Sequence, residues 1–481
     1  MFLWVLLPIM VLAWCWNRRH LYRHSRKVPG PHGLPLLGNL FDFTGTPSEI
    51  YDKTTKYFET YPNLAKVWFG PKLVYGVSKP EYLEKIFSSL TSFDKEESYR
   101  KFGGAFLGDG LLTASLPTWK RHRKIILPIF NQKVLNSFVE IFAKHFQFLN
   151  DEMEKHVGRE FDLYELLTRC TLDITCETIM GVEVGTQKGE LFLFKWLDRI
   201  LEITYLRQYS IWYHFDFMFK WTQLHKENLR LIGELNRFTE ELINKKRVQV
   251  STGCTPNRKS LLDLLLESSA EKLTTDEIKD EMQTFIIAAS DTTAVTACFI
   301  LVMLGMHPQI QNRVLEETNL ILGPDGRLEY QDIPRFEYTS RVIKETVRLF
   351  PPGPYVARHI EADLPLEENL VLPKGASVLL GLIHVQRSTE FWKDPLKFDP
   401  DRFLPKEVEK IYPHSYVPFA SGPRTCVGKK YALMSLTTMV ATVVRKFKIG
   451  TEYKSVDEIK LKTNMVIRPQ TGFKVWLELR K

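Results

Sequence analysis

The chain has 481 residues, of which 44% are hydrophobic and 25% charged, and its formal net charge is +8. This composition is ordinary for a globular protein and excludes a disordered, collagen-like or repeat-built chain. The six cysteines are scattered, without paired metal-ligand spacing or a dense disulfide framework, which favours a reducing compartment. Five positive charges fall between Arg18 and Lys27 with no acid among them, so the rest is near balance and nucleic acid is not an expected partner.

The first sixteen residues, MFLWVLLPIMVLAWCW, form an uninterrupted apolar run. A helix of this length spans roughly 24 Å, slightly less than the ~27 Å hydrocarbon core of the endoplasmic reticulum membrane. A cleaved signal peptide is the alternative, but no basic residue precedes the run and no clear small-residue cleavage site follows it. The positive cluster after the run predicts that the following chain stays in the cytosol. We therefore expect residues 1–16 to be a transmembrane signal anchor.

Residues 17–36 form a basic and proline-rich segment. The prolines between Val28 and Asn39 favour an extended path, and the glycines there allow the chain to turn. This composition predicts a short hinge that holds a globular domain, residues 37–481, against the membrane surface.

Helical patterns dominate the globular part, and strand-like alternation is confined to short segments at residues 64–70, 72–78, 377–383 and 472–479. The strongest helix signal begins with a capping box, Thr274-x-x-Glu277, and runs without Gly or Pro to Gly305. It predicts a buried central helix of about 30 residues, roughly 45 Å long, because its middle is apolar on nearly all faces. Further helices are predicted at residues 309–322 and 337–350, and an exposed loop at residues 248–259.

One cysteine lies in an unusual setting, the segment FASGPRTCVG from Phe419 to Gly428. A helical pattern follows Cys426, and a helix N-terminus, nearby cations and backbone N–H groups all stabilise a thiolate. Gly422 and Gly428 permit a tight turn and the close approach of a flat group. A lone cysteine is more often a buried structural residue; zinc lacks partner ligands here, and a nucleophile needs a base that the sequence does not place.

The pattern F-x-x-G-x-R-x-C-x-G is matched at every fixed position and resembles the haem-ligand loop of the cytochrome P-450 family. The resemblance implies a mainly α fold with small β-sheets and a long central helix, preceded by the membrane anchor. It also implies that Cys426 is the thiolate ligand of the haem iron and the metal-binding residue. Arg424 then pairs with a haem propionate, Phe419 shields the sulfur, and Gly428 allows the macrocycle to approach the backbone.

A second family motif, E-x-x-R, is present as Glu345 and Arg348, three residues apart on one helix face. Alone it is a weak signal, because many surface helices carry such a pair. Here it lies in an apolar helix and is followed by Pro400-Asp-Arg402-Phe403, which looks like the family's P-x-R-F segment. The resemblance implies a buried network of Glu345, Arg348 and Arg402, which is tolerable only if every charge is partnered.

The central helix contains Ala288-Ala-Ser-Asp-Thr-Thr293, which resembles the family's A-G-x-D-T-T oxygen-activation motif. The simpler interpretation of the hexamer alone is local bonding of Ser and Thr hydroxyls to helix carbonyls. Together with the cysteine loop, the resemblance implies that Asp291 and Thr292 are catalytic, an acid–alcohol pair that delivers protons during dioxygen activation.

Three further residues match cofactor-binding positions of the family. Trp119 and Arg123 fit W-x-x-x-R and lie about one helical turn apart, so both could contact a propionate. Arg358 occupies another position that commonly pairs with a propionate. For each arginine alone, a solvated surface charge is the alternative.

The segments Glu281–Thr293 and Pro418–Ala432 look most like the microsomal clan that includes fatty-acid omega-hydroxylases, especially its insect branches. Many members carry a glutamate that esterifies the haem where this chain has Ala288. We therefore expect haem b to be non-covalent apart from the Cys426–iron bond. Ala289 replaces the usual glycine and narrows the oxygen groove by a methyl group, and both changes put terminal fatty-acid hydroxylation in doubt.

Electrons are expected from outside the chain, because no flavin or nicotinamide motif is evident and the glycines of Lys101–Gly110 lack G-x-G-x-x-G spacing. A cytosol-facing anchor implies NADPH–cytochrome P-450 reductase as donor, with cytochrome b5 as a further partner. The cations expected around its docking face, unless they are simply solvated, are Lys120, Arg121, Lys124, Lys429 and Lys430.

The aromatic stretch from Leu191 to Trp221 either roofs the substrate pocket and dips into the lipid bilayer or packs in the core. The favoured hypothesis is a haem-thiolate monooxygenase of the endoplasmic reticulum membrane that faces the cytosol. It inserts one atom of dioxygen into an apolar substrate (a fatty acid, terpenoid, steroid or xenobiotic) with electrons from NADPH. A non-oxygenating haem isomerase or dehydratase and a haem-binding protein without turnover are the alternatives, and the intact Asp291-Thr292 motif argues against both.

Overall fold

The computed structural model describes residues 16–34, 36–189, 193–252, 258–267, 273–323 and 326–480. The expected anchor lies outside the described residues except for Trp16, which is 70% exposed. The basic residues that follow form a short helix, α2 (Arg19–Ser25), where the sequence predicted only a hinge. Leu21 in this helix and Val28 after it are both buried. Burial of these two apolar side chains against the domain explains why the segment is structured.

The largest sheet joins strands from both ends of the chain, in the order β1 (Leu64–Phe69), β2 (Lys72–Val77), β7 (Ser377–Gly381), β4 (Tyr355–His359). β1 and β2 form an antiparallel hairpin, β2 runs parallel to β7, and β7 is antiparallel to β4. The predicted strands at 64–70, 72–78 and 377–383 are confirmed, but the last ends at Gly381. The chain turns there into α17 (Leu382–Gln386), whose apolar residues are buried.

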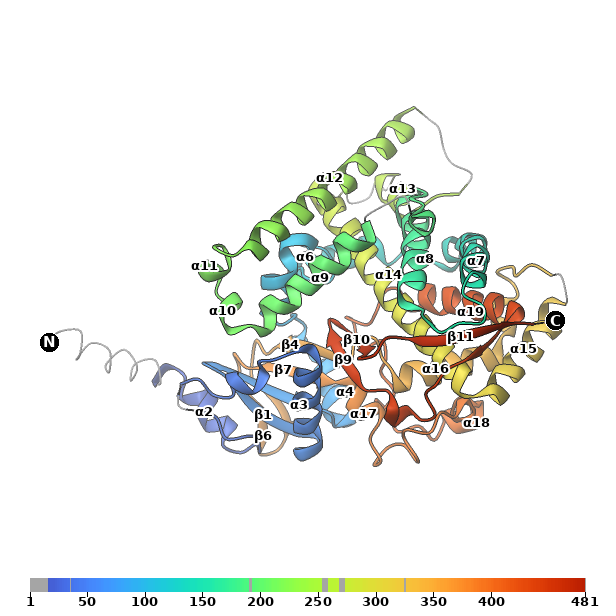
Figure 1. Cartoon of the computed structure of the whole chain (residues 1–481). Coiled ribbons are helices and arrows are strands. Elements are labelled where there is room, and N and C mark those ends of the chain that lie inside the picture. The colour runs from blue at the N-terminus through green and yellow to red at the C-terminus, as the bar shows by residue number, and fades with distance from the viewer. Residues whose placement is uncertain are drawn as a thin grey trace.

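Two helices lie near this sheet, and the remaining strands form smaller sheets (Figure 1). The helices near the sheet are α3 (Pro47–Thr60) and α4 (Pro80–Ser88). The remaining strands pair as β5 (Leu364–Glu367) with β6 (Leu370–Leu372), β9 (Leu461–Asn464) with β10 (Val466–Pro469), and β3 (Phe161–Asp162), β11 (Lys474–Leu479) and β8 (Phe447–Gly450) in one sheet. The predicted strand at 472–479 is therefore present as β11.

Helices make up most of the rest of the described chain. One group consists of α5 (Gly104–Leu107), α6 (Leu116–Ile126), α9 (Leu193–Tyr209), α10 (Ile211–His214), α11 (Asp216–Phe219), α12 (Gln223–Ser251) and α13 (Leu261–Glu267). Of these, α6, α9, α10 and α11 lie to the left of α14 in the view of Figure 1. The others are α7 (Gln132–Glu154), α8 (Tyr164–Thr175), α15 (Pro308–Leu322), α16 (Glu337–Leu349), α18 (Pro405–Val408) and α19 (Lys429–Lys446). α12 continues to Ser251, into the start of the predicted loop at 248–259, and residues 253–257 of that prediction lie outside the described residues.

The predicted central helix is confirmed as α14 (Thr275–Met306), which crosses the domain (Figure 1). Both bonds of the predicted capping box form between Thr274 and Glu277. Among the described residues α14 is the one helix long and apolar enough to cross a membrane. However, 83% of its apolar 18-residue stretch is buried inside the fold. It is therefore the core helix of the domain.

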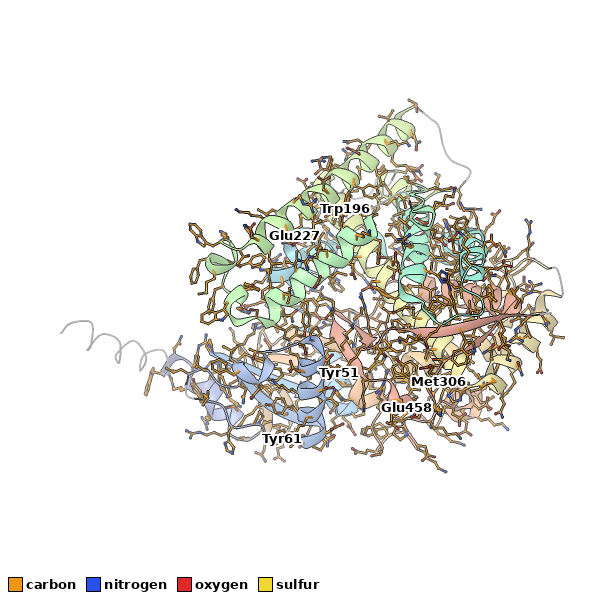
Figure 2. All side chains as sticks on the ribbon, in the orientation of Figure 1. Tyr51, Tyr61, Trp196, Glu227, Met306 and Glu458 are labelled. Carbon is orange, nitrogen blue, oxygen red and sulfur yellow. The ribbon has the colours of Figure 1, made fainter. Side chains whose placement is uncertain are left out.

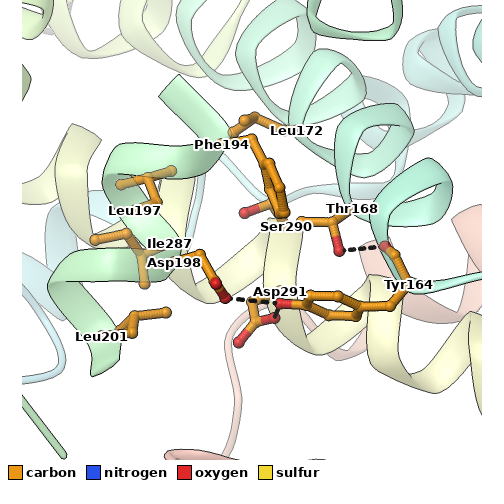
Figure 3. Close-up of a pocket in the computed structure, with 10 residues that line it drawn as sticks. All are labelled: Tyr164, Thr168, Leu172, Phe194, Leu197, Asp198, Leu201, Ile287, Ser290 and Asp291. Carbon is orange, nitrogen blue, oxygen red and sulfur yellow. Dashed lines mark hydrogen bonds between the residues drawn. The ribbon is translucent and has the colours of Figure 1, made fainter. Parts of the chain in front are cut away.

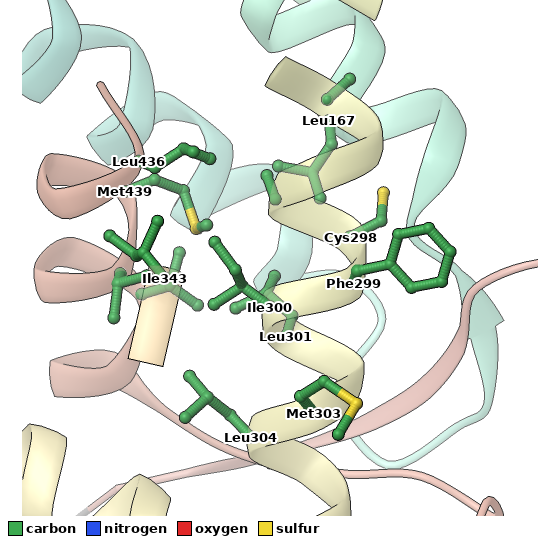
Figure 4. Close-up of a cluster of buried hydrophobic side chains, with 14 of the residues drawn as sticks. Leu167, Cys298, Phe299, Ile300, Leu301, Met303, Leu304, Ile343, Leu436 and Met439 are labelled. Atoms are coloured by element: carbon green, nitrogen blue, oxygen red, sulfur yellow. The ribbon is translucent and has the colours of Figure 1, made fainter. Parts of the chain in front are cut away.

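The main core surrounds the C-terminal half of α14, where every residue from Thr293 to Leu304 is buried. Figure 4 shows Ile300 and Leu304 of α14 on the side of Ile343 of α16 and Met439 of α19, with Phe299 on the opposite side of α14. This packing holds α16 and α19 against α14. It thereby fixes the start of α19, where the cysteine loop ends.

A separate layer of helices lies over the N-terminal half of α14. Arg199 on α9 forms two bonds of 2.8 and 2.9 Å with Glu227 on α12, which joins these two helices (Figure 2). The aromatic stretch predicted at 191–221, of which residues 193–221 are described, is buried in one part, as core packing predicts, and exposed in another. Leu197 and Ile200 of α9 are buried, whereas four aromatic residues on and beside α10 and α11 are exposed: Trp212, Phe215, Phe217 and Trp221.

Candidate active site

The cysteine loop is held by backbone geometry that needs glycine at one position. Gly422 has φ +71°, and a Cβ there would lie 2.2 Å from the carbonyl oxygen of Phe87. The amide of Cys426 donates to the carbonyl of Phe419 at 3.0 Å, which closes the loop. Gly428 then caps α19, so Cys426 lies directly before a helix N-terminus, as the sequence predicted.

The thiol of Cys426 differs from every other thiol that the structure describes. Cys170, Cys176 and Cys298 are buried, whereas Cys426 is exposed. Protein atoms nevertheless surround it, and this burial raises the pKa of its thiol, although a hydrogen bond from the Gly428 backbone and nearby cations oppose the shift. A side chain that is surrounded and yet uncovered on one side borders an internal space. The described residues contain no group of three or more His, Cys, Asp or Glu side chains that could hold a metal ion.

Cations gather around this space, and three of them, Arg123, Arg358 and Arg424, were predicted to bind a propionate. Arg358 is buried, and Arg424 is buried with its guanidinium 4.1 Å from the centroid of the Trp119 ring. Burial and repulsion from Arg358 and Arg424 lower the pKa of Lys95 well below its usual value, although its ammonium lies over the Tyr99 ring. Burial likewise lowers the pKa of Arg424 to about 10.

Too few carboxylates lie beside these cations to neutralise their charge. Among the described residues, Asp94 is the only carboxylate paired with any of Lys95, Arg123, Arg358 and Arg424, and it lies 3.5 Å from Arg424. Nη1 of Arg424 is buried and has no hydrogen-bond partner. Buried charges are costly unless they are paired. The two carboxylates of a haem would meet this need, so the residues present fit the group that the sequence implied.

One face of α14 borders an internal space. Ala288 is exposed and Ala289 and Thr292 are partly exposed, although the residues on either side of this stretch are buried. The hydroxyl of Thr292 donates to the carbonyl of Ala288 at 2.7 Å, which is the local helix bond that the sequence left open as an alternative. α14 is continuous through this stretch.

The carboxylate of Asp291 has partners other than Thr292. It accepts a hydrogen bond from the hydroxyl of Tyr164 on α8 at 3.0 Å (Figure 3). It also accepts one from Arg468 on β10 at 3.1 Å. Asp198 on α9 lies 3.4 Å from the same hydroxyl and 3.3 Å from Arg468. Burial raises the pKa of Asp291, and the charge of Arg468 opposes the shift. Sequence reasoning missed Tyr164 and Arg468, because they are 127 and 177 residues away from Asp291.

A small pocket of about 20 Å³ lies beside this cluster, with room for about one water molecule. Its walls come from α8, α9 and α14 (Figure 3). Asp198 at this pocket is 44% exposed, whereas the Asp291 side chain is 10% exposed. The cluster thus connects a solvent-accessible carboxylate with a buried one on the central helix.

The structure brings together the predicted charge network of Glu345, Arg348 and Arg402. Arg348 donates two bonds to Glu345, at 2.6 and 2.8 Å, and both side chains are fully buried. Nε of Arg402 lies 3.3 Å from the same carboxylate. Arg348 also donates to the carbonyls of Gln386 and Pro395 at 2.8 and 2.7 Å. These bonds join α16 to the segment that precedes the cysteine loop.

The remaining predicted residues lie around the same loop. Phe419 is partly buried, and the ammonium of Lys429 lies 5.7 Å from the centroid of its ring. Of the five cations expected on the docking face, Lys120, Lys124, Lys429 and Lys430 are exposed. Arg121 instead pairs with Glu277 of α14.

Comparison with known proteins agrees with this geometry. The family model described as "Cytochrome P450" matches residues 28–477. Cytochrome P450 4g15 of Drosophila melanogaster is 31% identical over an alignment that covers 100% of this chain and 97% of that protein. Human cytochrome P450 4V2 is 31% identical over 96% of this chain and 91% of its own length. A crystal structure of the cytochrome P450DA haem domain has a TM-score of 0.83 at 21% identity and covers 94% of this chain and 98% of that one.

The structural likeness confirms the predicted fold, and the relatives, which include insect and mammalian proteins, confirm the predicted family. Members of this family are haem-thiolate monooxygenases, and the arrangement of cysteine loop, cations and central helix is consistent with that chemistry. The chain belongs to the cytochrome P450 family and is a haem-thiolate monooxygenase.

Proposed function

We propose that Cys426 is the protein ligand of a non-covalent haem b and that Lys95, Arg123, Arg358 and Arg424 hold its propionates. The observation that carries this proposal is the buried Nη1 of Arg424, which has no partner beside cations that share a single carboxylate. Trp119 supports Arg424 by stacking against its guanidinium. The bound haem supplies the dioxygen chemistry, and the backbone N–H of Gly428 stabilises the thiolate.

Protons reach the site, in this proposal, through the cluster behind α14. Asp198 takes a proton from solvent, and the hydroxyl of Tyr164, which contacts both carboxylates, passes it to Asp291. Arg468 holds the two carboxylates in place. The side chains of Asp291 and Thr292 have separate partners. Asp291 must therefore rotate to give its proton to the oxygen of Thr292, and Thr292 must turn its own hydroxyl hydrogen away from the Ala288 carbonyl to pass a proton to the substrate side.

The substrate is an apolar small molecule that lies against Ala288, Ala289 and Thr292. The resemblance of residues 281–293 and 418–432 to fatty-acid omega-hydroxylases supports a fatty acid as the first substrate class to test, with terpenoids, steroids and xenobiotics as the others. The test uses purified chain, NADPH, reductase and ¹⁸O₂ with a panel from these classes. One labelled oxygen in the product supports monooxygenation. Rearranged or dehydrated product without label contradicts it.

The electron donor is NADPH–cytochrome P450 reductase, with cytochrome b5 as a second partner. The exposed cations Lys120, Lys124, Lys429 and Lys430 lie near the cysteine loop and suit an acidic partner surface. The reduction rate should fall as the salt concentration rises, because screening weakens contacts between exposed charges. A rate independent of salt would contradict this docking face.

The chain is anchored in the endoplasmic reticulum membrane by residues 1–16, and its domain faces the cytosol. The exposed aromatic residues Trp212, Phe217 and Trp221 support a second contact of the domain with lipid. Alkaline carbonate should leave the full chain in the membrane pellet, and a chain that begins at residue 17 should be released. Protease added to intact microsomes should digest the domain if it faces the cytosol.

A further inference from the structure

A buried carboxylate on α14, Glu281, joins two other walls of the site. It lies two helical turns before Ala288 and is fully buried. One of its oxygens is 2.7 Å from Nδ1 of His122 on α6, and the other accepts a bond of 3.3 Å from the backbone N–H of Leu111. The bond to His122 therefore reaches the helix that carries Trp119 and Arg123.

The surroundings of His122 favour its protonated, positively charged form. It is fully buried, and its Nε2 lies 3.5 Å from Glu277, which also pairs with Arg121. Burial lowers the pKa of His122, but its bond to Glu281 and the charges of both carboxylates outweigh that effect and leave the pKa raised. Burial raises the pKa of Glu281, and the hydrogen bond and charge of His122 oppose this shift. Arg121 and His122 thus face Glu277 and Glu281, and this pairing makes the buried groups tolerable.

The glycine-rich segment 108–110, which precedes α6, packs closely against α14 beside the Glu281–His122 pair. A Cβ on Gly108 would lie 2.1 Å from the carboxylate carbon of Asp280, and one on Gly110 would lie 2.1 Å from the hydroxyl of Thr284. The N–H of Asp109 donates to Asp280 at 2.8 Å. These glycines therefore serve close packing against α14.

α6 depends on such tertiary contacts for its position. It has 11 residues, and no side chain caps its N-terminus. Helices of this length are marginal on their own. Among its described side chains, Trp119 reaches the cysteine loop through Arg424, and His122 and Arg121 reach α14.

We infer that Glu281 is a positioning residue that holds α6 and the loop of residues 108–113 against α14, and so sets where Trp119 and Arg123 stand relative to the haem. The inference rests on the proposed haem site. Loss of the Glu281 charge should therefore loosen both the loop of residues 108–113 and α6 and weaken haem retention, while the cysteine loop and α19 stay in place.

The test compares Glu281→Gln with Asp276→Asn, which changes an exposed acid on the same helix. Hydrogen exchange of the purified holoproteins should be about tenfold faster in both 108–113 and 116–126 for Glu281→Gln, and unchanged in 429–446. Transfer of haem to excess apomyoglobin should also be about tenfold faster. The inference is overturned if exchange rises in only one segment or in neither, or if Asp276→Asn behaves alike.

Three further variants distinguish a joint role from local damage. His122→Gln and the double variant His122→Gln/Glu281→Gln should lose haem at the same rate within about twofold, because residues that act as a pair are not additive. If the rate increases of the two single variants multiply in the double variant, His122 and Glu281 act independently and the inferred pair is wrong. Gly110→Ala should loosen 108–113 alone, because its Cβ displaces the loop and leaves His122 paired; loosening of α6 as well would contradict the assigned contacts.

The proposed function has a separate readout, the thiolate spectrum of the wild-type haem. Its absence would refute the haem site, whereas the hydrogen-exchange comparison would still report on the Glu281 contacts by itself.

Discussion

Glu345→Gln removes the charge that the fully buried Arg348 and the partly buried Arg402 share. Glu345 and Arg348 are both fully buried, and Arg402 lies 3.3 Å away, so solvent does not replace the lost partner. Removing one member of a buried pair costs about 3–5 kcal/mol of unfolding free energy. Arg348 keeps its bonds to the carbonyls of Gln386 and Pro395. We therefore expect a loss near the lower end, about 3 kcal/mol.

The assay is urea unfolding of the holoprotein, followed by haem absorbance and far-UV circular dichroism. The difference in free energy is taken from the midpoints if the slopes agree. Glu337→Gln is the matched control, because Glu337 is exposed at the start of the same helix and should cost less than about 1 kcal/mol. A loss below about 1 kcal/mol for Glu345→Gln, or one equal to the control, would refute the reasoning.

Three other predictions concern the two sides of the haem site. Gly422→Ala should lower stability by at least about 1 kcal/mol and reduce the haem-loaded fraction, because φ is positive and the new Cβ meets the carbonyl of Phe87; full haem loading and unchanged stability would argue against this loop geometry. Ala288→Glu should make part of the haem resist extraction into acidified solvent, because it introduces the glutamate that esterifies the haem in many members of the clan. All wild-type haem should extract. Arg468→Gln should raise the pKa of Asp291 further, since the opposing cation is lost, so the acid limb of the pH–rate profile moves up by about one unit; an unmoved limb would exclude Asp291 from proton delivery.

The central helix and the main strands could be predicted from local patterns. The capping box at Thr274 and the continuous apolar run define α14, and alternation defines β1 and β2. Helix α2 was missed because its signal is the burial of Leu21 in the folded domain, which no local pattern of a basic segment reveals. The end of β7 at Gly381 was missed for a similar reason, because the change to α17 depends on packing.

The site was predictable where a motif lies in one segment and unpredictable where distant segments meet. Cys426 and its loop follow from ten consecutive residues. Lys95 was missed because only a bridge to Arg358 brings it to the cation cluster. Asp291 and Thr292 are neighbours in sequence, but successive helix residues point about 100° apart, so each has its own partners.

The carbon monoxide difference spectrum of the reduced, haem-loaded full chain tests the central claim most directly. Thiolate ligation by Cys426 predicts a strongly red-shifted Soret band in the wild-type protein and its loss in folded, haem-loaded Cys426→Ser. Folded, haem-loaded wild-type protein without that band, or a Cys426→Ser variant that keeps it, would contradict the account.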